Sequence, residues 1–110
     1  MTINKNNTYK KYNKLVRDRI PEIIRTDGKK CQVQIVSGKE KYDLLEKKLI
    51  EEVNEFLEDK NLEELSDIME VLFGLANDMG YTEKDLLKKR EDKKDKRGGF
   101  KDGIVLINVN

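Results

Sequence analysis

Residues 40–78, EKYDLLEKKLIEEVNEFLEDKNLEELSDIMEVLFGLAND, decide the fold because they contain two helical patterns in succession. In the first half, apolar residues recur at three- and four-residue steps, which predicts a helix over about residues 40–59. Asn61 followed by Glu64 is a capping-box signature, and it predicts a second helix that runs to about Asp78. Because antiparallel helices joined by a short loop pack their apolar faces together, we expect these two to form the core.

Carboxylates lie on or beside the apolar face of both predicted helices. At about 100° per residue, Glu52 falls inside the apolar stripe of the first helix and Glu55 falls on its edge, with Glu51 further round. On the second helix, Glu64 falls among the apolar residues and Asp67 falls on their margin. We therefore expect these side chains to meet near the loop that joins the helices.

Half-buried carboxylates that converge repel one another and lose hydration, so they take up protons or bind a cation. The chain has no histidine and one cysteine, Cys31, which leaves oxygen as the ligand atom. An all-oxygen set suits Mg²⁺, Mn²⁺ or Ca²⁺ better than zinc or copper. The alternative is that Glu52 and Glu64 are ordinary helix residues at the rim of the stripe, with Glu64 serving only as a capping residue.

The composition bounds the class of protein. A chain of 110 residues with 41% charged and 36% hydrophobic residues buries a modest core, so we expect a subunit interface or a ligand to add stability. The absence of histidine excludes Ser-His and Cys-His catalysis and every His-ligated zinc site. With one cysteine and no long apolar run, we expect a cytoplasmic protein without a membrane partner.

Charge is distributed unevenly along the chain. Residues 1–39 have a net charge of +7, residues 40–70 of −8 and residues 84–110 of +4. An acidic centre between basic ends suits a metal–polyphosphate ligand, because carboxylates hold the cation while Lys and Arg bind phosphates. The alternative is a set of solvated helix faces.

The remaining elements are shorter. We expect a helix over residues 17–27 and another from about Thr82 to Gly98, while residues 31–36 and 103–109 have the pattern of strands. The fold class is therefore mainly α, with a helical bundle and a small two-stranded β element.

Three motifs carry a resemblance to a known family. Residues 51–55 (EEVNE) and 64–67 (ELSD) resemble the EExxE…ExxD pattern of the MazG-like all-α nucleoside triphosphate pyrophosphohydrolases. Residues 12–24 (YNKLVRDRIPEII) resemble the opening of the phosphoribosyl-ATP pyrophosphohydrolase-like, or house-cleaning NTP pyrophosphatase, branch. Residues 93–100 (KKDKRGGF) resemble its closing motif. We therefore expect one MazG-like domain over residues 12–110.

Residues 1–11 are polar, and we expect them to form a flexible N-terminal segment that precedes this domain.

The resemblance implies Mg²⁺-dependent hydrolysis of a nucleoside triphosphate to a monophosphate and pyrophosphate, with Mn²⁺ as a substitute. It implies a homodimer or homotetramer that acts on canonical or noncanonical nucleotides. By position, the implied metal ligands are Glu52, Glu55, Glu64 and Asp67. The implied catalytic residues are Glu51, Glu52 and Glu55, with Glu51 holding the metal or orienting the attacking water.

Basic residues of the opening and closing motifs could reach the phosphates. They are Lys14 and Arg17 near the start and Lys93 and Arg97 on the last predicted helix. For Arg17 the alternative is a local ion pair with Asp18, and for Lys93 it is a solvated helix face.

Other functions remain open at this stage. One is phosphoribosyl-ATP hydrolysis, and another is a non-catalytic protein that binds or sequesters nucleotides. Nucleic-acid binding is disfavoured by the 6% aromatic content and the acidic centre.

Overall fold

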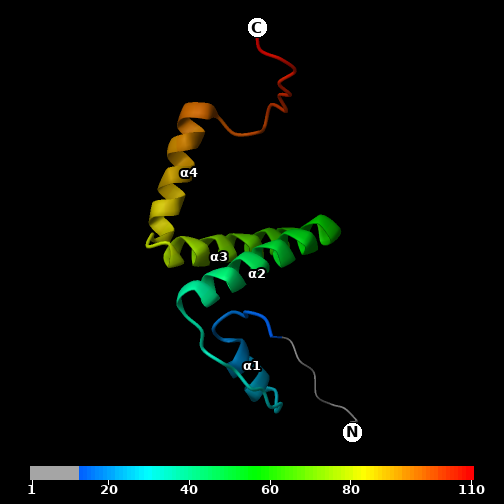
Figure 1. The fold of residues 1–110 in the computed structure, drawn as a ribbon. Helices are drawn as coiled ribbons and strands as arrows, with labels where there is room; N and C mark the ends of the chain where they lie inside the picture. Colours follow the sequence, from blue (N-terminus) through cyan, green and yellow to red (C-terminus); the bar gives the residue numbers. More distant parts are fainter. Residues whose placement is uncertain (1–12) are drawn as a thin grey trace.

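The computed structural model describes residues 13–110, which fold into four helices (Figure 1). In chain order, these are α1 (Ile20–Thr26), α2 (Gly38–Asp59), α3 (Leu62–Asp78) and α4 (Glu83–Arg97). The mainly α class expected from the sequence is confirmed. The flexible segment predicted over residues 1–11 lies outside the described residues.

A tight connection reverses the chain between α2 and α3. Lys60 ends α2 in the left-handed region, with φ 49° and ψ 53°, and the next residue begins the return. The side chain of Asn61 accepts a hydrogen bond from the backbone N–H of Glu64 at 2.9 Å, as its N-cap position requires. The two helices therefore run side by side in opposite directions (Figure 1).

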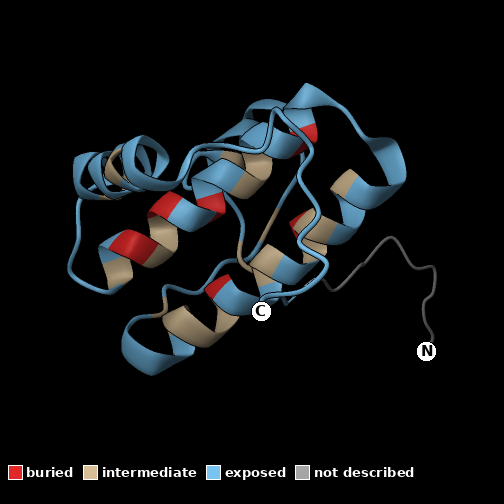
Figure 2. Cartoon of the chain, turned by 90° about the horizontal axis from the view of Figure 1, so that it is seen from above, coloured by how far each residue is buried: buried red, intermediate tan, exposed pale blue. Residues whose placement is uncertain are grey.

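The core lies between α2 and α3, which supply every buried residue of the described chain (Figure 2). A Cβ on Gly74 would meet the Leu45 side chain at 3.1 Å, so glycine allows the helices to approach closely. Two of the buried residues are glutamates, which is unusual for a seam between helices. The buried residues are Leu45, Glu52, Glu64, Val71, Phe73 and Ala76.

The outer helices lie away from this core. α4 packs on α3 alone, and α1 packs on none of the three longer helices. The Cα radius of gyration is 19.2 Å, whereas a compact domain of this length has about 13 Å. Many apolar side chains therefore remain exposed in the single chain.

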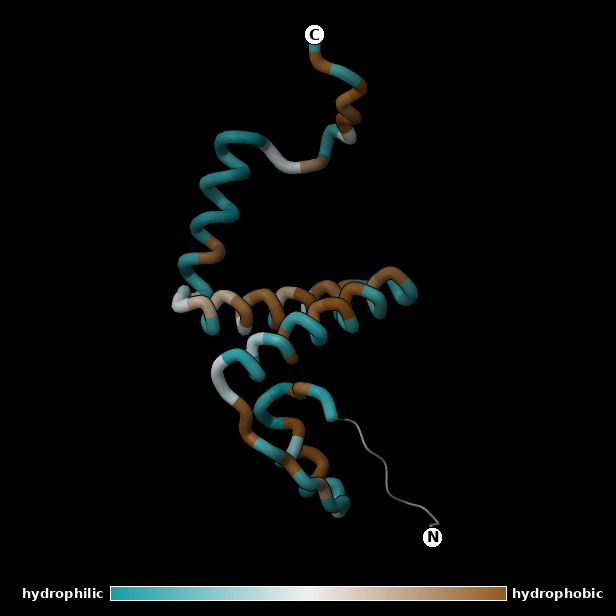
Figure 3. The backbone as a smooth tube through the Cα atoms, in the orientation of Figure 1, coloured by the Kyte–Doolittle hydropathy of each residue, from teal (hydrophilic) through white to brown (hydrophobic). Residues whose placement is uncertain are grey.

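The prediction of a two-stranded β element is wrong for residues 13–110, which contain no strand. Residues 31–36 lie beside α1, whereas residues 103–109 lie beyond the far end of α4, and this C-terminal stretch is strongly apolar (Figure 3). Ile35 is 89% exposed and Ile104 is 84% exposed. A strand needs a partner for its backbone hydrogen bonds, and the fold keeps these two segments apart.

None of the helices in residues 13–110 combines the length and apolar character needed to cross a lipid bilayer.

Candidate metal centre

Three carboxylates from two helices meet at the α2–α3 seam. Glu52 comes from α2, while Glu64 and Asp67 come from the first two turns of α3. Each offers a carboxylate oxygen, and the three oxygens lie within 4.8 Å of one another. The structure therefore brings together side chains that the helical geometry of the sequence placed on facing arcs.

A second group shares Glu52 with the first. Glu51, Glu52 and Glu55 also have carboxylate oxygens within 4.8 Å of one another. Glu55 is exposed, and Glu51 is half-buried. Because Glu52 belongs to both groups, the five carboxylates form one continuous cluster across the seam, which we call the carboxylate cluster.

Two oxygens in the carboxylate cluster are buried without a partner. Glu52 is 6% exposed and Glu64 is 8% exposed, and the Oε2 atom of each has no hydrogen-bond partner among the described residues. A buried carboxylate oxygen without a hydrogen bond is costly. The alternative that Glu64 serves only as a capping residue does not explain its side chain, because the cap uses its backbone N–H.

The electrostatics of these glutamates follow from burial. Burial raises the pKa of Glu52, and the charges of Glu55 and Asp67 raise it further against the opposing effect of Lys48. Burial also raises the pKa of Glu64, to which the charge of Glu55 adds. Both side chains therefore favour either a bound proton or a bound cation.

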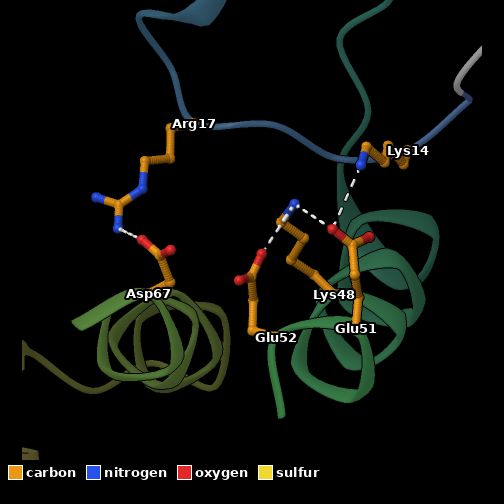
Figure 4. A network of polar contacts seen from close by, with 6 residues as sticks. All are labelled: Lys14, Arg17, Lys48, Glu51, Glu52 and Asp67. Atoms are coloured by element: carbon orange, nitrogen blue, oxygen red, sulfur yellow. Dashed lines mark hydrogen bonds and ion pairs between the residues drawn. The ribbon is translucent and has the colours of Figure 1, made fainter. Parts of the chain in front are cut away.

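Lys48 is a site residue that the sequence reasoning missed. Its Nζ lies 3.0 Å from Oε2 of Glu51 and 3.3 Å from Oε1 of Glu52 (Figure 4). The available signal was spacing, because residues three and four positions apart on a helix are neighbours. Burial opposes the charge on Lys48, but its hydrogen bonds to both glutamates outweigh this effect and raise its pKa.

The pKa of Glu51 shifts in the opposite direction from the pKa of Glu52. Burial acts to raise the pKa of Glu51, but the hydrogen bonds and charges of Lys48 and Lys14 outweigh it and lower that pKa. Adjacent glutamates thus differ, with Glu51 held as an anion and Glu52 favouring neutralisation.

The segment before α1 adds two more cations. It passes over the α2–α3 pair and brings Lys14 Nζ to 3.3 Å from Glu51 Oε2 (Figure 4). Arg17 Nη2 lies 2.7 Å from Asp67 Oδ1. Arg17 thus pairs with Asp67 and not with Asp18, the local partner considered from the sequence.

The other two predicted phosphate ligands lie elsewhere. Lys93 and Arg97 belong to the last two turns of α4, which points away from the α2–α3 pair (Figure 1). Both residues are exposed. Within a single chain, the structure does not bring them to the carboxylate cluster.

The residues present fit a hard divalent cation. All donors in the cluster are oxygens, and the two buried Oε2 atoms lack the hydrogen bonds that a structural carboxylate would make. Such a donor set is typical of Mg²⁺ or Mn²⁺, which bind carboxylates together with substrate phosphates. Glu52, Glu64 and Asp67 could hold one ion, and Glu51 and Glu55 adjoin this group through Glu52.

A comparison of the chain with known protein families, with curated proteins and with solved structures found no match. The resemblance to MazG-like pyrophosphohydrolases thus stays a prediction from three short motifs. The geometry of the carboxylate cluster has to support any assignment of function.

Proposed function

We propose that this chain is a Mg²⁺-dependent nucleoside triphosphate pyrophosphohydrolase, which converts an NTP and water into an NMP and pyrophosphate. The observation that supports it is the carboxylate cluster, in which Glu52 and Glu64 each bury an unpartnered Oε2 atom within the described chain. Three cationic side chains border the same cluster, as a ligand made of a metal and phosphates requires.

In this proposal, the acidic side chains bind the metal ion and the basic side chains bind the phosphates. Glu52, Glu64 and Asp67 hold the divalent cation, with Glu55 at the exposed edge of the cluster. A bound divalent cation would neutralise the triphosphate and help to polarise the phosphorus under attack. The basic residues Lys14 and Arg17 then bind phosphate oxygens, for which Arg offers two parallel hydrogen bonds and Lys a point charge.

The hydrolytic step needs an oriented water molecule and an acceptor for its proton. Glu51 is half-buried and lies beside Glu52, so its carboxylate can accept a hydrogen bond from water and orient it. Glu55 is exposed and takes the proton as the water oxygen bonds to the α-phosphorus. The bond to the bridging oxygen breaks, and pyrophosphate leaves with its electron pair. No histidine is required.

The proposal includes a homodimer or homotetramer. Leu65, Met69 and Leu72 follow one another at four- and three-residue steps on α3, with exposed fractions of 47%, 51% and 40%. Such an apolar stripe is typical of a helix that packs against a partner. The hollow beside the carboxylate cluster, lined by Lys48 and Glu51, has a volume of about 50 Å³, whereas ligand pockets have about 300 Å³ or more.

A second copy would therefore both cover the stripe and help to enclose the nucleotide. Lys93 and Arg97 stay in the proposal as phosphate ligands that one copy supplies to a neighbour, because α4 projects away from the cluster of its own chain (Figure 1).

The ion pairs at the cluster also fit a second function, a non-catalytic protein that binds nucleotides without hydrolysing them. Lys14, Lys48 and Arg17 already form ion pairs with the carboxylates, so the cluster is partly neutralised without any ligand. Measured formation of products distinguishes the hydrolase from the non-catalytic binding protein, whereas measured nucleotide binding does not.

The experiment is a substrate panel with Mg²⁺ and then Mn²⁺, and its readout is chromatography of the products. The panel contains NTPs, dNTPs, oxidised and deaminated nucleotides, and phosphoribosyl-ATP. We expect a monophosphate and pyrophosphate from at least one nucleotide. Phosphoribosyl-ATP as the sole substrate would select the histidine-synthesis reaction, and binding without any product would select the sequestering protein.

A further inference from the structure

Lys48 is the most enclosed cation at the carboxylate cluster. Its side chain is 17% exposed, against 44% for Lys14 and 52% for Arg17. A lysine stem is often covered by its neighbours while the ammonium seeks water or a partner of opposite charge. Here the ammonium lies between the carboxylates of Glu51 and Glu52 (Figure 4).

This position coincides with the place where a metal ion would act. Glu52 is the residue shared by both carboxylate groups, and Lys48 contacts its Oε1 atom at 3.3 Å. The Oε2 atom of Glu52 has no hydrogen-bond partner in residues 13–110. A divalent cation at Glu52 would share one carboxylate with the Lys48 ammonium, and the repulsion between the two positive charges would favour displacement of the ammonium.

A triphosphate can pair with the Lys48 ammonium once the metal ion has displaced it from Glu52. Lys14, Arg17 and Lys48 all contact the carboxylate cluster, and Figure 4 shows their charged groups on the side covered by the segment before α1. A triphosphate that arrives with its metal meets these three cations as the metal meets the carboxylates. The three cations then exchange carboxylate partners for phosphate oxygens, and the carboxylates exchange cationic side chains for the metal ion. No buried charge is left without a partner.

We infer that Lys48 is a counter-ion of Glu51 and Glu52 before ligand binding and a phosphate ligand afterwards. It lowers the affinity of the cluster for a bare divalent cation and raises the affinity for a metal–triphosphate complex. Lys48 thereby selects the complex over the free ion. This inference rests on the proposed function, because it assumes that the cluster binds a metal and a triphosphate together.

The test replaces Lys48 by methionine, which has a similar length and no charge. Binding of Mn²⁺ alone is measured at pH 8 from the electron paramagnetic resonance signal of the free ion. Binding of an α,β-methylene nucleoside triphosphate, which this reaction cannot cleave, is measured calorimetrically with Mn²⁺ present. We expect K48M to bind Mn²⁺ alone about threefold or more tightly and the analogue about tenfold more weakly.

Two further variants make the comparison specific. Lys84→Met removes the same charge from an exposed position on α4, outside the carboxylate cluster, and we expect both affinities to stay close to those of the parent protein. Lys48→Arg keeps the charge, and we expect it to restore weak binding of Mn²⁺ alone. Circular dichroism checks helical content, and Lys48→Gln replaces the methionine variant if that protein does not fold.

The outcomes separate this inference from the proposed function. If neither the parent protein nor K48M binds Mn²⁺, alone or together with the analogue, both are overturned. A parent protein that binds Mn²⁺, with unchanged or weaker Mn²⁺ binding in K48M, overturns the inference and leaves the metal site standing. Tighter binding of both Mn²⁺ and the analogue overturns the phosphate role, because Lys48 would then be a competitor only.

Discussion

The α2–α3 pair and α4 are helical for different reasons. The pair buries apolar side chains and two glutamates along its seam, whereas α4 has no buried residue. α4 depends on local contacts, with Thr82 and Asp85 forming a reciprocal capping box and Lys88 pairing with Asp92 one turn on. Tertiary packing can desolvate a carboxylate and local contacts cannot, so the candidate chemistry lies in the pair.

The largest effect should follow from changes to the carboxylate cluster. We expect Glu52→Gln and Asp67→Asn each to reduce Mg²⁺-dependent pyrophosphate release by about 10²-fold or more, because each removes a charged ligand. Helical content, measured by circular dichroism, should stay intact. Glu91→Gln on α4 is the matched control, since its exposed carboxylate lies outside the cluster. Full activity in both cluster variants would remove these residues from the mechanism.

Truncating a side chain should lower the free energy of unfolding much more in the α2–α3 pair than in α4. Leu45 is 6% exposed between α2 and α3, and Leu45→Ala should lower the free energy of unfolding by about 2–4 kcal/mol through lost burial and a cavity. Leu87 on α4 is 42% exposed, and Leu87→Ala should cost about 0.5 kcal/mol or less. Urea denaturation followed by circular dichroism measures both. Equal losses would mean that α4 packs in solution in a way the single chain does not show.

Self-association should depend on the exposed apolar stripe of α3 and not on Leu87 of α4. Sedimentation of the parent protein at micromolar concentration should give at least twice the 12.9 kDa chain mass. Met69→Glu places a charge in the exposed apolar stripe of α3. It should shift the protein toward monomer, because burying an unpaired carboxylate at the interface has a large desolvation cost. Leu87→Glu on α4 should leave the mass unchanged. A stable monomer of the parent protein contradicts the proposed assembly.

The smallest effect is a pH dependence of stability. Burial raises the pKa of Glu64 above its ordinary value of about 4.3, so ionisation destabilises the metal-free fold as pH rises through the raised pKa. Glu64→Gln mimics the protonated side chain. In a chelator, its melting temperature should match the parent near pH 4 and exceed it increasingly toward neutral pH. A constant difference across this range would show that Glu64 is not desolvated.

Local signals in the sequence predicted much of the site. Asn61 caps α3 as its spacing with Glu64 indicates, and the angular position of Glu52 places it on the seam. These predictions succeed because a helix repeats regularly, so spacing alone determines which residues share a face. Lys48 was missed although its spacing to Glu51 and Glu52 is equally regular, because ion-pair spacings are common on exposed helices.

Long-range features could not be predicted in the same way. The ion pairs Lys14–Glu51 and Arg17–Asp67 join residues 37 and 50 positions apart, and no local pattern specifies such partners. Residues 31–36 and 103–109 have strand-like composition, but neither segment has a strand partner among residues 13–110. A strand is stabilised by its neighbour, so its composition alone could not decide the outcome.

The amino-acid sequence by itself determined the helices, the turn between α2 and α3, and the gathering of carboxylates on two facing arcs, because these follow from local periodicity and capping. Only the tertiary structure decided which carboxylate oxygens are buried without partners and which cations lie over them. The physical reason is that desolvation and ion pairing depend on surfaces brought together from distant parts of the chain.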